Sequence, residues 1–287
     1  MDQPRTYVTG KAFRRALEDR LKQKSAAEGL DLQRLMREVA FDRLLARLFK
    51  QEDAPWILKG GYAMELRIKE ARVTRDIDLA LRQALDAGRD LPLDEAILEA
   101  LAKAAAQDLG DFFAFAIGAT MLDLDAAPYG GARFPVEARL DDRTFVRFHL
   151  DVGAGDVVLT PLDVTQAHDW LEFAGIPGAK FPTISQEQQF AEKLHAYTLP
   201  RKSPNTRARD LVDMLLLIHS GKLDRAKVKN ALRATFERRK THPLPSSLEP
   251  PPPAWTEPFA QLAQECRLSG DLSEAFRELA AYFSGLS

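Results

Sequence analysis

The sequence has few of the features that mark secreted, membrane-spanning or strongly charged proteins. It contains one cysteine among 287 residues, Cys266, so no internal disulfide can form. No stretch reaches the ~18 to 20 consecutive apolar residues that a membrane-spanning helix needs. The 40 basic and 42 acidic side chains leave a formal net charge of -2, which excludes a global field that would draw the whole molecule onto a polyanion. Any site for phosphate or nucleic acid must therefore be local.

Two further absences narrow the class of protein. Five histidines without paired ligand spacing argue against a zinc site. The polar residues at the start of the sequence lack the continuous apolar segment of a secretory signal. The hydrophobic content is 45%, which is enough for a substantial core, and the length suits one large domain or two modest ones. We therefore expect a globular, cytoplasmic protein.

Hydrophobic periodicity predicts helices in both halves of the chain. Apolar residues recur at helical spacing in residues 11–24 and 32–48, and again in residues 93–108, 187–197, 206–220, 225–239 and 273–283. The proline-rich residues 242–255 predict an extended connector, because proline fixes φ and removes a backbone donor. The later half reads as a helical lobe. We expect two domains, residues 1–182 and 183–287.

Strand patterns lie between the two helical regions. An apolar run at residues 56–58 leads into Gly60 and Gly61 and then a helix-like segment at residues 63–68, which predicts a strand, a tight turn and a helix. Strict alternation predicts a strand at residues 76–81, and residues 112–117 read as a buried strand. Residues 134–140 and 144–152 predict an antiparallel pair joined by a turn at Asp141 and Asp142. The fold class is therefore α+β.

Three aspartates in these strands are candidates for a metal site. A strand has a side-chain period of two, so Asp76 and Asp78 project from the same face, and so do His149 and Asp151 in the later strand. Carboxylate oxygens are ligands that Mg²⁺ prefers. An Asp-x-Asp pair alone is also explained by a solvated strand edge. Asp151 gives this pattern a third carboxylate.

The glycine pair adds a possible phosphate site. Without β-carbons, Gly60 and Gly61 would let a phosphate approach backbone amides at the positive end of a helix, although a plain tight turn explains them too. Transfer of a nucleotidyl group needs positioned phosphates and charge neutralisation by magnesium ions more than covalent chemistry by the protein. A glycine pair, an Asp-x-Asp strand and a later strand ending in aspartate together favour this chemistry.

The motifs also have a familiar order. They are Leu58-Lys59-Gly60-Gly61 followed by Arg72-x-Thr74-Arg75-Asp76-x-Asp78-Leu79, then Asp151-Val152-Gly153, Ala191-Glu192-Lys193-Leu194 and Asn205-x-Arg207-x-Arg209-Asp210-Leu211-x-Asp213. In these motifs the sequence resembles the AbiEii/AbiGii, or MenT-like, nucleotidyltransferase toxins of bacterial type IV toxin–antitoxin systems. The resemblance extends over most of the chain. It implies a polymerase-β-like nucleotidyltransferase core with a mixed sheet, flanked by N-terminal helices and a C-terminal helical lobe.

The resemblance also implies roles for individual residues. Thr74 and Asp76 would be a hydroxyl and a carboxylate needed for activity, Lys193 would contact the triphosphate, and Asp210 would support catalysis. Without the resemblance, the sequence indicates only that Lys193 is a solvated lysine on a helix. The aspartate four residues after Arg209, Asp213, reads as that arginine's partner in a surface ion pair.

Two positions depart from the family pattern. Many members of the wider superfamily have serine after the first glycine, whereas this chain has Gly61 and then Tyr62, so no hydroxyl is available there and backbone amides must bind the phosphate. Arg209 stands where lysine is expected, which keeps the charge and changes its geometry. His149 and His195 border the motifs without an assigned role, and we expect Cys266 to be a packed or half-exposed thiol.

The acceptor of the nucleotide is less defined. Enzymes of this superfamily modify RNA ends, proteins or small molecules such as aminoglycosides, and the resemblance favours the 3′ end of transfer RNA. It also implies a nucleoside triphosphate donor, Mg²⁺ and a cognate antitoxin from a neighbouring gene. Eight basic residues against two acidic ones between Lys222 and Lys240 would suit a phosphate backbone, although a solvated helix face explains them equally well. A protein or antibiotic acceptor, and a binding module without activity, stay open.

Overall fold

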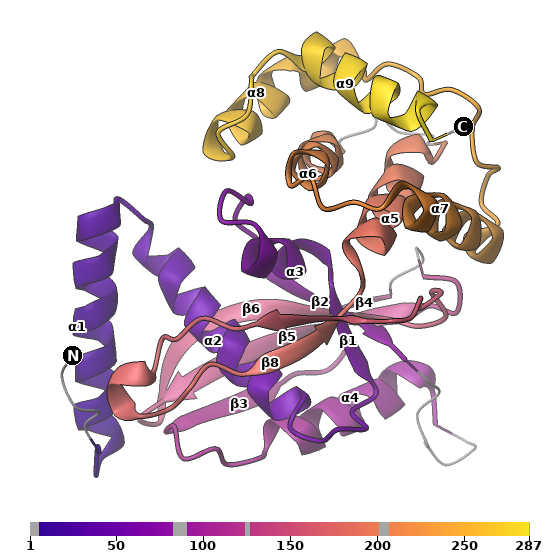
Figure 1. Cartoon of the computed structure of the whole chain (residues 1–287). Helices are drawn as coiled ribbons and strands as arrows, with labels where there is room; N and C mark the ends of the chain where they lie inside the picture. Colours follow the sequence, from indigo (N-terminus) through magenta and orange to yellow (C-terminus); the bar gives the residue numbers. More distant parts are fainter. Residues whose placement is uncertain (1–5, 83–90, 124–126, 201–206, 287) are drawn as a thin grey trace. The chain divides into compact units, whose positions relative to one another are not determined.

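The computed structural model describes residues 6–82, 91–123, 127–200 and 207–286, and the chain divides into two compact units (Figure 1). Unit 1 contains Met1–Leu58, Arg75–Gly155 and Val164–Thr183. Unit 2 contains Lys59–Thr74, Asp156–Asp163 and Ile184–Ser287. Two short segments of the earlier half therefore belong to the compact unit that holds the C-terminal helices. The division into two domains, residues 1–182 and 183–287, stays a prediction.

Unit 1 is built on a mixed sheet. In the described residues its order is β3-β5-β6-β2-β1-β8-β7, with β4 paired to β5 outside this path. The pairs β1–β8 and β2–β6 are parallel, and β5 is antiparallel to β3, β4 and β6. The strands are β1 (Trp56–Lys59), β2 (Asp76–Leu81), β3 (Phe113–Ile117), β4 (Leu122–Asp123), β5 (Gly131–Leu140), β6 (Arg143–Gly153), β7 (Asp163–Gln166) and β8 (Lys180–Thr183).

The hairpin of β5 and β6 follows from its turn. Asp141 and Asp142 both have positive φ, 55° and 56°, which aspartate tolerates and which matches the twist of a two-residue hairpin. The predicted antiparallel pair and its turn are confirmed. Alternate residues of β5, from Ala132 to Leu140, are buried, so one face of the hairpin packs into the core.

The α-helices in the described part of unit 1 are α1 (Gly10–Glu28), α2 (Leu32–Leu48) and α4 (Leu93–Ala105). Thr9 and Asp31 cap the first two by accepting hydrogen bonds from Ala12 N and Arg34 N. In Figure 1, α2 lies over one face of the sheet, and Phe41 packs against Phe148 of β6 with ring centroids 4.8 Å apart. The two predicted N-terminal helices are confirmed.

A buried ion cluster ties α2 to the start of β3. Arg47 and Arg43 of α2 both donate to the carboxylate of Asp111, which is completely buried. The two guanidinium groups lower the pKa of Asp111 below its ordinary value, against the effect of burial, which alone would raise it. Removal of Asp111 would leave two buried guanidinium groups without their shared carboxylate partner.

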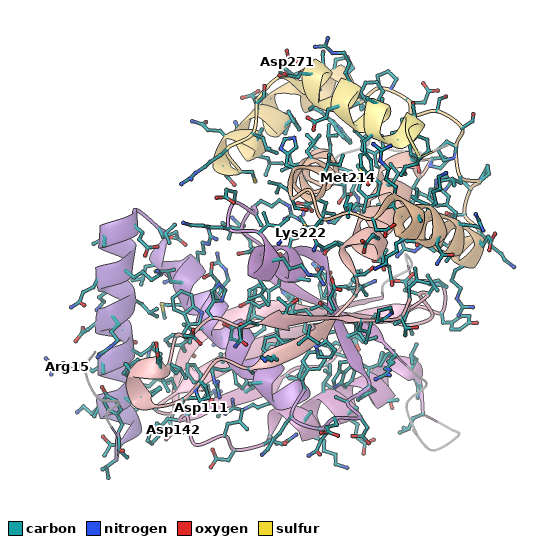
Figure 2. The ribbon with its side chains drawn as sticks, viewed as in Figure 1. Arg15, Asp111, Asp142, Met214, Lys222 and Asp271 are labelled. Atoms are coloured by element: carbon teal, nitrogen blue, oxygen red, sulfur yellow. The ribbon has the colours of Figure 1, made fainter. Side chains whose placement is uncertain are left out.

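Unit 2 is mainly helical. Its core contains Met214, which is fully buried on α6 and labelled in Figure 2, together with buried side chains of other helices such as Phe190, Phe259 and Leu279. The helices are α3 (Gly60–Arg67), α5 (Gln186–Thr198), α6 (Ala208–His219), α7 (Arg225–Arg239), α8 (Thr256–Glu265) and α9 (Leu272–Ser284).

The sequence missed one helix of unit 2 and a few residues at the ends of others. Helix α8 follows the proline-rich connector directly, and Pro258 is tolerated because it lies in the first turn of the helix. The start predicted for α6, Thr206, lies outside the described residues, as does Asn205 of the last motif. Cys266 is buried, which confirms the packed thiol. Among the residues that the structure describes, no helix is both long and apolar enough to cross a membrane.

Candidate active site

Strand register brings the predicted carboxylates of unit 1 onto neighbouring strands. Asp78 of β2 lies opposite Asp151 of β6, and on the other side of β6 Asp151 lies opposite Arg133 of β5. Asp76 lies opposite His149 in the next row of the same face. The other face of β2 carries Ile77 and Leu79, both fully buried. The sheet therefore gathers three carboxylates and one arginine on one face, and we call these four residues the carboxylate row.

The arginine of the carboxylate row was not predicted from the sequence. Arg133 Nε donates to Asp151 Oδ1 and its Nη2 donates to Asp151 Oδ2, both at 2.7 Å. The same Nη2 lies 3.5 Å from Asp76 Oδ2. These contacts raise the pKa of Arg133, chiefly through the hydrogen bonds to Asp151. Bidentate charge-assisted bonds of this kind are among the strongest in proteins.

The remaining polar contact in this row involves histidine. His149 Nδ1 lies 3.3 Å from Asp76 Oδ1. About a third of the side-chain surface of Asp76 and Arg133 is exposed, 32% and 31%, whereas Asp151 is more enclosed at 13%. The row is therefore open to solvent and to a ligand. Its residues can exchange partners at lower cost than buried ions can.

The donor atoms of the carboxylate row suit a hard divalent cation. Asp76, Asp78 and Asp151 offer only carboxylate oxygens, the ligand type that magnesium prefers. In the described part of the chain, no three His, Cys, Asp or Glu side chains are already arranged around a common point as a metal site. Both carboxylate oxygens of Asp151 accept hydrogen bonds from Arg133 instead. The chemistry of the residues fits the metal, with the guanidinium as its competitor.

Gly60, Gly61 and Thr74 lie together in unit 2. Gly60 begins α3 with a φ of 67°, a conformation that glycine adopts without strain. A β-carbon on Gly61 would lie 2.6 Å from Thr74 Oγ1, so no larger residue fits there unless Thr74 moves. Glu65 accepts a hydrogen bond from the backbone N–H of Thr74, and Gln189 Nε2 donates to Gly60 O at 2.6 Å. The glycine pair thus permits close approach of the Thr74 segment.

Lys193 lies in a buried ion cluster of unit 2. Its Nζ is 2.7 Å from Asp213 Oδ2 and 3.1 Å from Asp210 Oδ1, and its side chain is 15% exposed. Burial alone lowers the pKa of Lys193, but the two carboxylates, Asp213 first, outweigh burial and raise it. The reading of Lys193 as a solvated lysine is therefore wrong. We call Lys193, Asp210, Asp213 and Arg72 the lysine cluster.

Asp213 corrects a second expectation. The predicted surface ion pair between Arg209 and Asp213 is wrong. Asp213 is 1% exposed and pairs with Lys193, whereas Arg209 is exposed. Arg72 also donates to it, from Nε to Oδ1 and from Nη2 to Oδ2, both at 3.0 Å. Burial opposes ionisation of Asp213, but Lys193 and Arg72 outweigh it and lower its pKa. The sequence signal was available: Asp210 and Asp213 lie on the same apolar face of α6 as Leu217.

A second buried network in unit 2 holds the residue before the glycines. Lys59 Nζ lies 2.7 Å from Asp156 Oδ2 and 3.4 Å from Glu192 Oε2, and Arg239 Nε donates to Asp156 Oδ1 at 2.9 Å. Burial would raise the pKa of Asp156, but Lys59 and Arg239 outweigh it and lower the pKa to about 2. The prediction that Arg239 belongs to an exposed basic surface is wrong, because its side chain is 12% exposed and paired.

His195 lies next to this network. Its Nε2 is 2.8 Å from Thr241 Oγ1, and its ring packs against Phe236 with centroids 4.9 Å apart. Burial, with a smaller contribution from the charge of Arg239, lowers the pKa of His195 to about 4. The ring is therefore neutral at physiological pH. This environment suits a packed structural histidine.

The rest of the basic segment on α7 does face solvent. The exposed cations are Lys222, Arg225, Lys227, Lys229, Arg233, Arg238 and Lys240. Two of them, Arg233 and Lys240, also line a cavity of about 560 Å³ together with Thr241, His242 and Leu244. A cavity of this volume admits a nucleotide-sized group. An exposed cationic face beside a cavity is a candidate polyanion-binding surface, within unit 2.

Comparison with known proteins was made for both sequence and fold. A family model described as nucleotidyl transferase AbiEii toxin, type IV TA system, matches residues 43–282. The solved structure of MenT4, a nucleotidyltransferase toxin from Mycobacterium tuberculosis H37Rv, is similar with a TM-score of 0.57 and 16% identity, over 94% of this chain and 98% of that chain. That of JHP933 from Helicobacter pylori gives a TM-score of 0.50 and 16% identity, over 90% and 93%.

None of the curated proteins matches the sequence. Identities of 16% support a shared fold alone. The likeness to MenT4 confirms the predicted α+β fold with a mixed sheet, N-terminal helices and a C-terminal helical region.

Proposed function

The chain belongs to the AbiEii family of nucleotidyl transferase toxins of type IV toxin–antitoxin systems, and we propose that it is a magnesium-dependent enzyme that adds nucleotides to an RNA 3′ end. Family membership implies a nucleoside triphosphate as donor and a cognate antitoxin as partner. Transfer RNA is the proposed acceptor, and nucleotides added at its 3′ end would block aminoacylation and hence translation. Both substrates belong to the cytoplasm, so this is the proposed location.

The register of β2 with β6 is the observation on which this proposal depends. Asp78 and Asp151 lie opposite each other, with Asp76 two residues along the same face of β2. Asp76, Asp78 and Asp151 would hold Mg²⁺, which supplies positive charge to the triphosphate and the attacking hydroxyl. The strands fix the spacing of the carboxylates, so that little of the binding energy is lost in ordering them.

The lysine cluster supplies a second positive group. We assign Lys193 to the triphosphate, because it keeps its charge although it is nearly buried. Asp210 and Asp213 hold the ammonium group, and Arg72 anchors Asp213 from the other side. A lysine held from two sides loses little conformational entropy when a phosphate binds. This cluster therefore suits a role in binding and orienting the donor.

The glycine segment is assigned to the same donor. Gly60 and Gly61 begin α3, at the positive end of the helix dipole, and without β-carbons they let a phosphate oxygen approach the backbone closely. Thr74 Oγ1 occupies the space beside Gly61 and adds a hydroxyl to this set. A substitution at Gly61 would displace that hydroxyl. Gly60, Gly61 and Thr74 are thus proposed nucleotide-binding residues.

The exposed cations of α7 favour an RNA acceptor. Lys229 and Arg233 are exposed one turn apart on α7, where they can contact neighbouring phosphates, and Lys227 adds an exposed cation on another side of the same helix. The cavity at the end of α7 is lined by Arg233 and Lys240, and an unpaired terminal nucleotide would fit its size. A small antibiotic would need no such extended surface.

Incubation of the purified protein with Mg²⁺, each labelled nucleoside triphosphate in turn and total RNA tests the proposal. We expect label in the transfer RNA band with one or more donors, none after addition of EDTA, and none with Asp76→Ala. If a protein or an aminoglycoside is labelled and RNA is not, the proposed acceptor is wrong, but the proposed nucleotidyl transfer still holds. Absence of label in every acceptor would favour a binding module without activity.

A further inference from the structure

Arg133 occupies a position that the proposed reaction does not use. It lies on β5, opposite Asp151 in the sheet register, so its guanidinium projects from the same face as the three carboxylates. Its fork spans both oxygens of Asp151 at 2.7 Å and reaches Asp76 at 3.5 Å. One side chain thus contacts two of the three proposed metal ligands.

The charge balance explains this arrangement. Asp76, Asp78 and Asp151 lie on one face of two adjacent strands, and three negative charges at this spacing repel one another. A positive side chain among them relieves the repulsion while no metal is bound. Arg133 meets this need with directed hydrogen bonds, and as an arginine it stays charged at any physiological pH.

The same geometry creates competition. A carboxylate oxygen that accepts a short hydrogen bond from a guanidinium must give up that bond to coordinate a metal ion in the same direction. Both oxygens of Asp151 are used in this way. The row is about one-third exposed at Arg133, so its side chain has room to move away.

We infer that Arg133 is the resident counter-ion of the metal-free site, and that a divalent cation binds by displacing its guanidinium from Asp151 and Asp76. This inference rests on the proposed role of the carboxylate row in metal binding. In this role Arg133 competes with the metal ion and stabilises the three carboxylates while no metal is bound. The consequence is a site that binds free metal weakly and keeps its strands intact without it.

The direct test is to measure the affinity of the protein for Mn²⁺ in the absence of nucleotide. The electron paramagnetic resonance signal of free Mn²⁺ reports how much of the ion is unbound. Arg133→Ala should bind Mn²⁺ about tenfold more tightly than the wild type, an order-of-magnitude value for the loss of a competing charge-assisted pair. Arg133→Lys should fall between them, since lysine keeps the charge and loses the fork. Arg139→Ala is the matched control on the same strand, because Arg139 pairs with Glu137 away from the row, and its affinity should equal that of the wild type.

Thermal unfolding gives a second readout that needs no activity. In EDTA, Arg133→Ala should unfold at a lower temperature than the wild type. Saturating Mn²⁺ should raise the Tm of Arg133→Ala by more than it raises the Tm of the wild type. The double variant Arg133→Ala/Asp151→Asn should lose the gain in affinity, which places the ion at this site. If Arg133→Ala does not fold, the same comparison is made with Arg133→Lys.

Equal or weaker Mn²⁺ binding by Arg133→Ala would overturn the inference, since the arginine would then be neutral toward the metal or would orient its ligands. If the wild type still labels RNA in Mg²⁺, only the counter-ion role fails. If neither protein binds Mn²⁺ and the wild type transfers nothing, the counter-ion role and the metal-dependent function both fail.

Discussion

The carboxylate row and the lysine cluster organise charge in opposite ways. In the row, strand register fixes the backbone positions, while the side chains of Asp76 and Arg133 stay about one-third exposed and can exchange partners. In the lysine cluster, helix packing buries Asp210 and Asp213 to 1% exposure, where Lys193 and Arg72 pair with them. Partly exposed charged side chains, as in the carboxylate row, can exchange one partner for a ligand. Buried charged side chains, as in the lysine cluster, hold a single group such as the Lys193 ammonium in a fixed orientation.

Loss of a carboxylate from the carboxylate row should give the largest effect of the variants proposed below. It should lower activity and leave stability nearly unchanged. Asp76→Ala or Asp78→Ala should lower turnover by roughly three to four decades, which corresponds to ~5 kcal/mol of transition-state stabilisation. The Tm should change little, because each side chain is partly exposed and lies outside the hydrophobic core. Steady-state transfer assays and thermal unfolding measure the two quantities. Asp19→Ala, an exposed aspartate on α1, is the control, and transfer at the wild-type rate by Asp76→Ala would remove the row from catalysis.

Loss of a carboxylate from the lysine cluster should instead reduce stability. Asp213→Ala leaves Lys193 and Arg72 without their main partner in a buried position, and we expect a loss of about 3 to 5 kcal/mol in the free energy of unfolding. Urea denaturation measures this loss. Arg209→Ala, four residues earlier on the exposed side of α6, should change stability by less than ~0.5 kcal/mol. Equal midpoints for the two variants would contradict the buried cluster.

Acid should affect the interior of unit 2 through His195. The pKa of His195 is lowered to about 4 in the folded state, below its unfolded value of 6.5, so the unfolded chain takes up the proton first. The stability from the neutral ring is therefore fully present above pH 6.5 and is lost as the pH falls towards 4. We expect the loss to reach about 2 kcal/mol, and His195→Gln should abolish that part of the pH dependence.

Urea denaturation at several pH values between 7 and 4 gives the comparison. His219→Gln is the matched control, because His219 is 46% exposed and pairs with Glu278. A wild-type slope that His195→Gln leaves unchanged would assign the acid sensitivity to other groups.

The smallest expected effect concerns the exposed face of α7. Replacement of Lys227, Lys229 and Arg233 together by alanine should weaken RNA binding by about tenfold and reduce the slope of log affinity against log salt by about two units. Affinity for the triphosphate should not change. The triple replacement of Lys11, Arg15 and Lys22 on α1 removes the same charge from another exposed surface and serves as control. Equal slopes for the two variants would move RNA binding away from α7.

The sequence predicted elements whose patterns are local. The alternation of residues 76–81 and 144–152 identified β2 and β6, since one buried face leaves a period of two. Strands β4, β7 and β8, of two to four residues, were missed because so short a run shows no periodicity. Helix α8 was missed because four consecutive prolines before it suggested a connector that continues.

The site residues follow the same division. Asp76 and Asp78 could be found because their spacing is visible within one strand. Arg133 and Lys59 could not, because their partners Asp151 and Asp156 are brought close by register and packing between segments 18 and 97 residues apart. Long-range pairing leaves no mark at one position of a single sequence. The roles of the site residues themselves stay predictions until the variants are assayed.

The parallel pairing of β2 with β6 also has a consequence for synthesis of the protein. Asp76 lies opposite His149, 73 residues later in the chain, so the carboxylate row exists only after β6 has left the ribosome and paired with β2. Nascent chains that stop before residue 143 lack β6 and with it Asp151, although they contain the whole Asp-x-Asp strand. Truncated products of this nucleotidyltransferase toxin therefore lack the proposed metal site, because the order of strand formation postpones its assembly until the sheet is complete.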